Sequence, residues 1–404
     1  MMTFATIMKL IVVILFWVSL MGLLHTYVIF PLLMRLLLIL KLRAKASDNN
    51  TPIRPVVSIL VAAHNEEKVI AEKLESVMQN DYPADKLEIF VGSDNSDDGT
   101  DSVVKKLSEK YHQISLIRFE SRTGKPGIIN QLVKQCSGEL LIITDANVMF
   151  EMNTISALAE RFENEKVGLV DSNMVNVGML QSGISVQEKK YIQTEVLTKF
   201  AEGEIWGSMM GPFGGCYAVR KNLFSDIPAN FLVDDFFVCM RVLEQGYHCV
   251  SSLEAIVYEE ASHNLWIEFR RKVRIATGNF QNLAKFSKMI FKGRGIGFCF
   301  MSHKVLRWIG PVLMLILYFS AFTAWWLSVG INPVLCLGVF EAISLSFLLF
   351  LADRLLNLFQ IHVGLLRLNT HFLAMNAAML KGMFRYIKGV KSGVWQPTSR
   401  TQKA

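Results

Sequence analysis

Long apolar stretches lie at the two ends of the chain, and a region of mixed composition lies between them. The apolar stretches cover residues 4–40 and 305–385, whereas residues 45–300 have the composition of a globular domain. A helix needs about 20 apolar residues to cross a bilayer. The first stretch, "KLIVVILFWVSLMGLLHTYVIFPLLM", is longer than that and lacks the small-residue cleavage site of a signal peptide. We therefore expect a retained anchor, a domain large enough for a substantial core, and further spans after it.

Basic residues beside the apolar stretches predict the orientation of the central domain. They are Lys41, Arg43, Lys45 and Arg54 after the first stretch, and Lys292, Arg294, Lys304 and Arg307 before the next. Positive flanks are typical of the cytoplasmic side, so the domain is expected in the cytoplasm, at the plasma membrane or bacterial inner membrane.

The C-terminal stretch contains two predicted spans and one ambiguous segment. The spans are "GPVLMLILYFSAFTAWWLSVG" and "NPVLCLGVFEAISLSFLLFLA", and Asp353 and Arg354 predict a return to the cytoplasmic side. The last segment, "HFLAMNAAMLKGMFRYIKGVKSGVW", is apolar enough to enter lipid, but its basic residues Lys381, Arg385, Lys388 and Lys391 favour a cytoplasmic end. The segment therefore lies in the interface, re-enters the membrane, or crosses it against the charge rule, and the sequence does not decide among the three.

In the central domain, strands and helices alternate, and each strand ends in a polar turn. Apolar runs open "VVSILVAAHNEE", "LEIFVGSDNSDDGT" and "ISLIRFE", and the run in "GELLIITDANVMF" is continuous, as in strands buried on both faces. Helical segments such as "SRTGKPGIINQLVKQCSG" separate them. This order predicts a mostly parallel α/β sheet with right-handed crossovers. The polar turns should then meet at the carboxyl edge, where such sheets bind ligands.

Four residues in these turns predict a site for a nucleoside diphosphate. They are Asp94, Lys125, Asp145 and Asn147. A carboxylate such as Asp94 can accept a hydrogen bond from a base ring N–H, and a cation such as Lys125 can offset phosphate charge. Asp145 can hold a divalent ion between the phosphates. The sequence shows no Walker A loop or glycine-rich dinucleotide fingerprint, which argues against kinase, P-loop ATPase and hydride-transfer functions.

Composition agrees with a membrane-bound chain and argues against nucleic acid as a partner. Of the 404 residues, 51% are hydrophobic, and the mean hydropathy of +0.33 is high for a purely soluble protein. Basic residues that face anionic lipid account for the net charge of +7 and the pI near 9.0. Six cysteines without paired short spacings predict neither a disulfide framework nor a zinc cluster.

Six motifs in order resemble membrane-bound family-2 glycosyltransferases, the group of the cellulose, hyaluronan, chitin and poly-N-acetylglucosamine synthases. The motifs are "VSILVAAHNEE", "GSDNSDDGT", "RTGKPGIINQL", "TDAN", "GGCYAVRK" and "LVDDFFVCMRVLEQGYHCV", and they cover roughly residues 55–280. The resemblance implies a Rossmann-like GT-A fold, a nucleotide-sugar donor that is usually UDP-linked, and transfer with inversion.

The resemblance also implies donor-side roles. The residues matching donor-binding positions are Ala63, Asn65, Glu66, Asp94, Lys125, Asn130, Asp145 and Arg274. Asp94 resembles the acid that binds uracil. Asp145 matches the first Asp of the family's DxD motif, the ligand of Mg²⁺ or Mn²⁺. Asn147 stands in place of the second Asp, which keeps an oxygen ligand and removes one negative charge, so weaker metal binding is implied.

Asp234 and Asp235 occupy the position of the synthases' TED motif, whose final Asp is the catalytic base. A helix N-terminal cap is the structural alternative for such a pair. Two adjacent carboxylates suit base catalysis as well, because one raises the pKa of the other toward the working pH.

Two further stretches resemble parts of the family that face the acceptor and the leaving group. Gly214, Gly215 and Cys216 in "GGCYAVRK" match the acceptor side, although paired glycines also form ordinary turns. Processive synthases carry QxxRW where this chain retains Arg274 but has Ile275 in place of Trp. An arginine there can hold the pyrophosphate leaving group, whereas the loss of the Trp argues against long-chain processivity.

We therefore expect an enzyme with four regions: an anchor at 1–44, a GT-A domain at 45–262, interfacial amphipathic helices at 263–304, and a C-terminal transmembrane region with a basic tail at 305–404. The leading hypothesis is transfer of a sugar from a UDP-sugar onto a growing polysaccharide at the cytoplasmic face. Transfer of one sugar to a lipid-linked acceptor is the alternative, and a non-catalytic membrane scaffold or sensor is the rival from another class. A requirement for partner subunits is left open.

Overall fold

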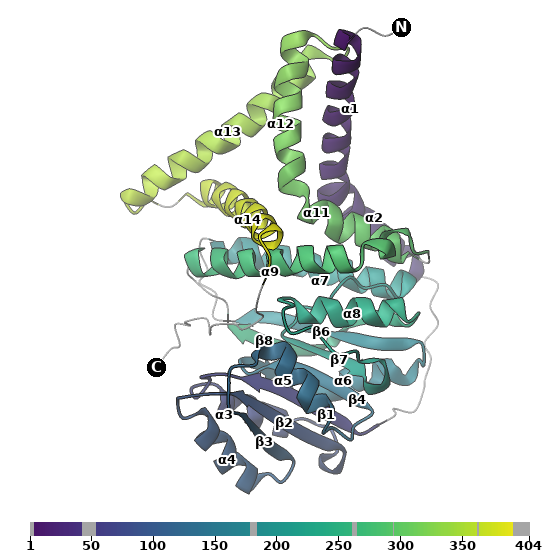
Figure 1. The fold of residues 1–404 in the computed structure, drawn as a ribbon, viewed down its shortest axis with the longest axis vertical. Helices are drawn as coiled ribbons and strands as arrows, with labels where there is room; N and C mark the ends of the chain where they lie inside the picture. The colour runs from purple at the N-terminus through teal and green to yellow at the C-terminus, as the bar shows by residue number, and fades with distance from the viewer. Residues whose placement is uncertain are drawn as a thin grey trace.

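The computed structural model describes residues 4–42, 54–177, 184–260, 265–293, 295–361 and 363–390 (Figure 1). Arg43, Lys45 and Arg294, which entered the prediction of orientation, lie outside the described residues, as does the basic tail from residue 391. An α/β domain occupies one end of the molecule, and long apolar helices occupy the other (Figure 1).

In the described part of the chain, an eight-stranded mixed sheet with the order β3-β2-β1-β4-β7-β6-β8-β5 forms the centre of the domain. The strands are β1 (Val57–Ala63), β2 (Leu87–Asp94), β3 (Ile114–Phe119), β4 (Leu140–Asp145), β5 (Val148–Phe150), β6 (Val167–Val177), β7 (Cys216–Arg220) and β8 (His248–Glu260). The four predicted strands are β1 to β4, and they are mutually parallel as predicted. β7 is antiparallel to both β4 and β6, a reversal that the sequence pattern did not predict.

Side chains of β1 alternate between two apolar cores, one on each face of the sheet. Val57, Ile59 and Val61 pack on the face covered by α3 (Ile70–Met78), α4 (Thr100–Lys110) and α6 (Thr154–Glu160). Leu60 and Ala62 pack on the opposite face, covered by α5 (Gly124–Val133) and α8 (Asp234–Glu244). Burial of both faces explains why the strands read as continuous apolar runs.

Among the described residues, three helical stretches are long and apolar enough to cross a membrane. The first, Phe4–Lys41, comprises α1 (Phe4–Leu24), a π-helical turn at His25–Ile29 and most of α2 (Phe30–Leu42). The others are α12 (Gly310–Leu327) and α13 (Pro333–Leu358), and α12 lies between α1 and α13 (Figure 1). The short helices α10 (Ile296–Cys299) and α11 (Leu306–Trp308) flank a π-helical segment, Phe300–Val305, before α12.

Asp353 and Arg354, where the sequence predicts that the chain leaves the membrane, do not form a loop, because both residues lie inside α13. Asp353 is buried, and its Oδ1 lies 3.3 Å from Nε of Arg367 on the next helix, α14 (Gly364–Ile387). An ion pair between neighbouring helices therefore accounts for a charge within an apolar segment.

Two helices lie side by side between the α/β domain and the apolar helices. They are α9 (Leu265–Lys285) and α14 (Figure 1). A Cβ added to Gly382 of α14 would lie 2.4 Å from Cβ of Ala276 on α9, so the glycine permits the close approach. α14 is not among the candidate spans of the described residues.

Candidate functional site

The carboxyl ends of β1, β2 and β4 meet at one edge of the sheet. Ala62 pairs with Asp145, and Ala63 pairs with Ser93, the residue before Asp94. The predicted convergence of the two acids at this edge is therefore confirmed by the register. The candidate site lies at this edge, where α5 and α8 begin and where the loop before β7 ends.

Asp94 is fully buried and anchors the start of α5. Oδ1 accepts a hydrogen bond from the backbone N–H of Thr123 at 2.6 Å, and Oδ2 accepts from the N–H of Gly124 at 3.1 Å and from Nε of Arg122 at 3.0 Å. Donors from the helix N-terminus and the guanidinium therefore occupy both carboxylate oxygens. Arg122, which the sequence reasoning missed, adjoins the "TGK" stretch; its Nη1 also lies 2.6 Å from Nε2 of His64.

Asn65 and Glu66 connect the turn after β1 to the turn after β2. Asn65 has a left-handed φ of +55°, a conformation that asparagine tolerates better than most residues. Its side-chain oxygen accepts from the N–H of Asp97 at 3.0 Å, and the N–H of Glu66 donates to Oγ1 of Thr100 at 2.9 Å. These contacts hold the two polar turns together beside Ala63.

Lys125 links the predicted metal ligand to the predicted catalytic pair. Its Nζ lies 2.6 Å from Oδ1 of Asp145 and 3.8 Å from Oδ2 of Asp234. Burial alone would lower the pKa of Lys125, but the charges of Asp145, Asp234 and Asp235 outweigh it and raise the pKa above its ordinary value. The lysine is therefore a fixed positive charge in the middle of three carboxylates.

Asp235 has the environment of a general base. Burial and the neighbouring charge of Asp234 raise its pKa to about 7, and the charge of Lys125 only partly opposes them. The structure does not show the helix-cap alternative. Both aspartates lie in the first turn of α8, and the N-cap position is Val233, where no side chain makes a capping hydrogen bond. A carboxylate with a pKa near 7 can take a proton from an acceptor hydroxyl at neutral pH.

The glycines before β7 bring the backbone close to this carboxylate. Gly214 has φ of +80°, and a Cβ there would lie 2.7 Å from Oδ2 of Asp235. A Cβ on Gly215 would lie 2.3 Å from Cε of Met174. Cys216 is fully buried in the core, so its side chain supports the strand and does not line the site.

Arg274 of α9 completes the positive side of the cluster. Its Nη1 donates to the backbone oxygen of Leu232 at 3.2 Å. Burial and then the neighbouring Arg271 lower its pKa, and the charges of Asp234, Asp145 and Asp235 oppose this shift. The side chain thus contacts the loop before α8 and is close enough to the three carboxylates to feel their charges.

The candidate metal ligands fit an ion that arrives with a diphosphate. In the ranges that the structure describes, no group of three His, Cys, Asp or Glu side chains is placed to hold an ion. Divalent ions bound to nucleotides commonly use one or two protein ligands together with phosphate oxygens and water. Asp145 keeps 38% of its side chain exposed, and Asn147 is oriented through its nitrogen, which donates to Oε1 of Glu259 at 3.2 Å.

Asn130 makes a different contact from the one that the resemblance implies. Its amide nitrogen donates to the backbone oxygen of Ile227 at 2.8 Å, and its amide oxygen accepts from the N–H of the same residue at 2.9 Å. The side chain joins α5 to the loop before α8, and we leave it out of the proposed donor site.

Lys73 on α3 was missed by the sequence reasoning and lies directly beneath the 145–147 turn. Its Nζ donates to Oγ1 of Thr144 at 3.0 Å and to the backbone oxygen of Val148. Burial lowers its pKa to about 7. The available signal was its position on the apolar stripe of the helix beside Ile70 and Leu74.

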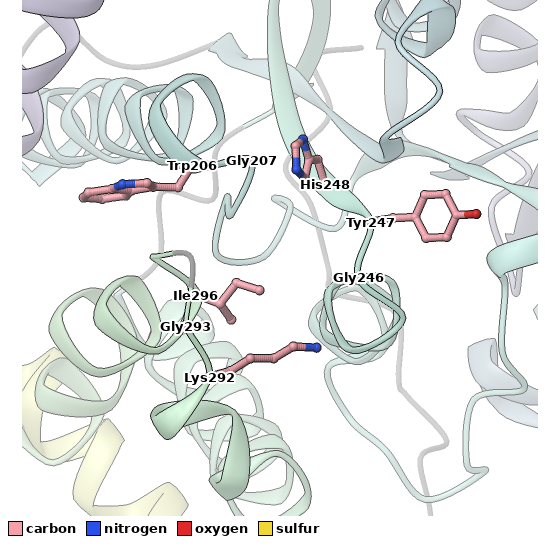
Figure 2. A pocket seen from close by; sticks show the side chains of 8 residues that line it. All are labelled: Trp206, Gly207, Gly246, Tyr247, His248, Lys292, Gly293 and Ile296. Atoms are coloured by element: carbon pink, nitrogen blue, oxygen red, sulfur yellow. The ribbon is translucent and has the colours of Figure 1, made fainter.

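The structure also contains a partly open cavity of about 250 Å³, and none of the predicted site residues lines it (Figure 2). Trp206, His248 and Lys292 are among the residues lining it, with Gly246 just after the C-terminus of α8. The candidate base is at the N-terminus of the same helix. Eleven helical residues span roughly 16 Å, so the cavity and the carboxylate cluster are separate.

Comparison with known families agrees with this geometry. The profile "Glycosyl transferase family 2" matches residues 58–227, and "Glycosyl transferase family group 2" matches residues 155–352. The chain belongs to the family-2 glycosyltransferases. It is therefore an enzyme of this class, and the hypothesis of a non-catalytic scaffold is not supported.

Curated relatives include synthases that are named for different products. The chain is 28% identical over 249 residues to "Probable glycosyltransferase YdaM" of Bacillus subtilis, covering 59% of this chain and 58% of that protein. It is 34% identical over 118 residues to the beta-monoglucosyldiacylglycerol synthase of Trichormus variabilis (29% and 25%). It is 30% identical over 118 residues to the poly-beta-1,6-N-acetyl-D-glucosamine synthase of Staphylococcus epidermidis (29% and 28%). The matches thus span 58% or less of these relatives.

A solved structure shares the fold over nearly the whole chain. The mannosyltransferase PcManGT from Pyrobaculum calidifontis, in complex with GDP-Man and Mn²⁺, superposes with a TM-score of 0.67 at 19% identity, covering 92% of this chain and 99% of that one. The similarity confirms the predicted GT-A fold with apolar helices toward both ends.

Proposed function

We propose that this family-2 glycosyltransferase moves a sugar, with inversion, from a UDP-sugar to the hydroxyl of a membrane-associated acceptor. The observation that carries the proposal is the cluster of Asp145, Lys125 and Asp235, because it combines a phosphate-side acid, a fixed cation and a carboxylate with a pKa near 7. Such an arrangement can bind a diphosphate on one side and deprotonate an acceptor on the other.

On the donor side, Asp94, Arg122 and Lys125 act together. Asp94 accepts from Arg122 and from the start of α5, so the three groups form one preorganised unit where the base and phosphates would lie. Both uracil and guanine carry a ring N–H. The family resemblance favours UDP, whereas GDP-Man in the PcManGT complex makes GDP-sugars the comparison for any donor test.

A divalent ion, Mg²⁺ or Mn²⁺, would be held by Asp145 and Asn147. When bound, it supplies positive charge that stabilises the diphosphate leaving group. The Mn²⁺ in the PcManGT complex supports a divalent cofactor. Arg274 and Lys125 add fixed positive charge on the protein side of the leaving group.

On the acceptor side, Asp235 takes the proton of the attacking hydroxyl. Burial and Asp234 keep its pKa near 7, so the ionised form is available at neutral pH and is basic enough to be effective. Gly214 brings the backbone of the loop before β7 against this carboxylate. An acceptor hydroxyl placed over Gly214 would therefore lie next to the base.

We favour a lipid-linked acceptor over a growing polysaccharide. Three helical stretches among the described residues are candidate spans, and they pack as a row, with α12 between α1 and α13 (Figure 1). A row of three helices does not enclose a polymer channel, whereas α9 brings Arg274 to the site from the membrane-facing side. The name of the Trichormus relative supports a lipid acceptor.

Polysaccharide synthesis is the second candidate, because the Staphylococcus relative is named for that activity. Cytoplasmic placement of the domain at the plasma membrane, or bacterial inner membrane, is part of the proposal and rests on flanking basic residues such as Lys41 and Lys304. Glycan or lipid-linked acceptors and membrane lipids are the proposed partners.

The test is a screen of UDP- and GDP-sugars with the full-length protein in nanodiscs that contain dioleoylglycerol. Release of UDP with formation of one labelled glycolipid is expected. A labelled polymer insoluble in organic solvent would move the function to polysaccharide synthesis. Turnover of GDP-sugars alone would overturn the proposed donor.

A further inference from the structure

The loop that carries the acceptor-side glycines, residues 207–215, is held by two buried carboxylates through its backbone. We call it the acceptor loop. Oε2 of Glu202 accepts from the N–H of Met210 at 3.0 Å, and Oδ1 of Asp171 accepts from the N–H of Phe213 at 3.1 Å. Both carboxylates are almost completely buried. A buried carboxylate is tolerated only when its oxygens have polar partners, so each of the two needs a second partner on its other oxygen.

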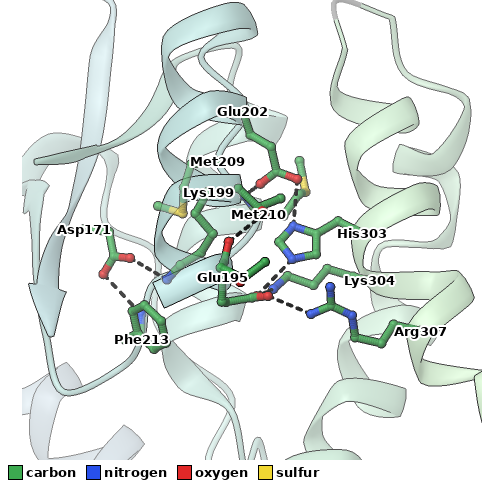
Figure 3. A network of polar contacts seen from close by, with 12 residues as sticks. Asp171, Glu195, Lys199, Glu202, Met209, Met210, Phe213, His303, Lys304 and Arg307 are labelled. Atoms are coloured by element: carbon green, nitrogen blue, oxygen red, sulfur yellow. Dashed lines mark hydrogen bonds and ion pairs between the residues drawn. The ribbon is translucent and has the colours of Figure 1, made fainter. Parts of the chain in front are cut away.

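The second partners of these carboxylates come from different parts of the fold (Figure 3). Oδ2 of Asp171 is paired with Nζ of Lys199 on α7 (Ile184–Trp206) at 2.6 Å, which is local to the domain. Oε1 of Glu202 faces Nδ1 of His303 at 2.7 Å. His303 belongs to the Phe300–Val305 segment, which leads into the apolar helix α12. The second link therefore joins the acceptor loop to the membrane-side helices.

His303 is held between two carboxylates. Its Nε2 lies 2.9 Å from Oε1 of Glu195, which also pairs with Nζ of Lys304 at 2.7 Å and, through Oε2, with Nη1 of Arg307 at 2.7 Å. Burial would raise the pKa of Glu195, but His303, Lys304 and Arg307 hold it well below its ordinary range. Nδ1 of His303 is within hydrogen-bonding distance of Glu202, and Nε2 lies beside Glu195, so the ring is enclosed between the two carboxylates.

The same segment also supports the helix that carries the candidate base. Phe236, the residue after Asp235, packs against Phe300 and Trp308 with ring centroids 6.0 and 5.3 Å away. Oγ of Ser302 lies 2.8 Å from Nε2 of His25 in the first apolar stretch. Residues 300–308 therefore contact the first membrane-side helix, the acceptor loop through Glu202, and the start of α8.

We propose that Glu202 and His303 are positioning residues for glycosyl transfer: their buried pair ties the acceptor loop to the membrane-side helices and so sets where the acceptor hydroxyl meets Asp235. This inference rests on the proposed acceptor role of Gly214. It explains why ionic groups persist in a dry interface, where an apolar contact would pack with less desolvation cost. The pair also fixes the position of the acceptor loop relative to the membrane from which the acceptor comes.

The test compares three substitutions by glutamine in the full-length protein in nanodiscs. His303→Gln and Glu202→Gln remove the pair, and Glu202→Gln keeps an oxygen that can accept from Met210. Lys304→Gln is the matched control, because it removes a cation from Glu195 at the same interface without a contact to the acceptor loop. UDP-sugar and dioleoylglycerol are the substrates, with donor hydrolysis measured without dioleoylglycerol.

We expect His303→Gln and Glu202→Gln to raise the KM for the acceptor or lower kcat by roughly tenfold or more, since small displacements of reacting groups cost this much. The KM for the donor should change less than about twofold, and the ratio of transfer to hydrolysis should fall. Lys304→Gln should resemble the parent. Equal acceptor kinetics in His303→Gln and Lys304→Gln would overturn the proposal.

Hydrogen–deuterium exchange gives a second readout that does not depend on the acceptor. The backbone N–H of Met210 should exchange faster in His303→Gln than in Lys304→Gln, whereas that of Phe213 should change less, because Asp171 and Lys199 remain. Unchanged protection of Met210 would refute the link even if transfer to dioleoylglycerol is absent. Absent transfer in the parent would refute the proposed acceptor and leave the exchange comparison decisive for the link.

Discussion

Replacing Gly214 with alanine would place a methyl group against the candidate base. A Cβ at this position would lie 2.7 Å from Oδ2 of Asp235, whereas ordinary contacts begin near 3.4 Å, so the two groups must separate by about 0.7 Å. The φ of +80° adds about 1–2 kcal/mol of backbone strain for an L-residue. A misplacement of this size at a reacting group can cost roughly 10²-fold in rate.

Gly246→Ala provides the matched control. Gly246 has φ of +89°, and nothing lies within 4 Å of an added Cβ, so this variant carries the strain without the contact. We expect both variants to lose a similar amount of thermal stability, but only Gly214→Ala to lose turnover, by roughly ten- to a hundredfold. UDP release, UDP affinity and thermal unfolding would be measured side by side. Equal turnover in the two variants would refute the placement of Gly214 against the base.

Further predictions concern the metal, the pH profile and the lysine beneath the metal turn. Excess chelator should abolish turnover, and Asp145→Ala should weaken donor binding as well as rate, because an ion on the diphosphate contributes to both; full activity in chelator would contradict the metal role. As pH falls through about 7, Asp235 takes up a proton and the base is lost, so kcat/KM should fall about tenfold per pH unit below that value; a flat profile between about pH 5.5 and 8 would count against this. Lys73→Met should raise the Mn²⁺ concentration needed for half-maximal rate several-fold, while the exposed Lys68→Met should not; equal metal requirements would reduce Lys73 to a packing role.

The parallel half of the sheet could be predicted because its signals are local. The apolar run of β4 ends at Asp145, and the run of β2 ends at Asp94, so the sequence alone placed both acids at strand ends. Parallel pairing then required them to share an edge. The same reasoning does not reveal β7, whose antiparallel pairing with β4 depends on a chain reversal after α7.

The contacts that define the site could not be predicted because they join residues far apart in sequence. Asp94 is occupied by Arg122 and the start of α5, a partnership that the motif did not reveal. The approach of Gly214 to Asp235 depends on how the acceptor loop packs on α8. The sequence predicts that a span ends near Asp353, because an unpaired charge is unfavourable inside an apolar segment. Its ion-pair partner, Arg367, belongs to the following helix and could not be identified from the sequence.

The most direct test of the central claim is turnover of Asp235→Asn measured with its UDP affinity and thermal stability. Asparagine keeps the size of the side chain but cannot take the hydroxyl proton, so turnover should fall roughly 10²-fold or more with UDP affinity nearly unchanged. Folding raises the pKa of Asp235, so its ionisation destabilises the folded state as pH rises through about 7, and the variant should unfold at the same or a higher temperature near pH 8. Asp226→Asn, at an exposed aspartate, is the control. Near-normal turnover in Asp235→Asn would contradict the assignment of this residue as the base.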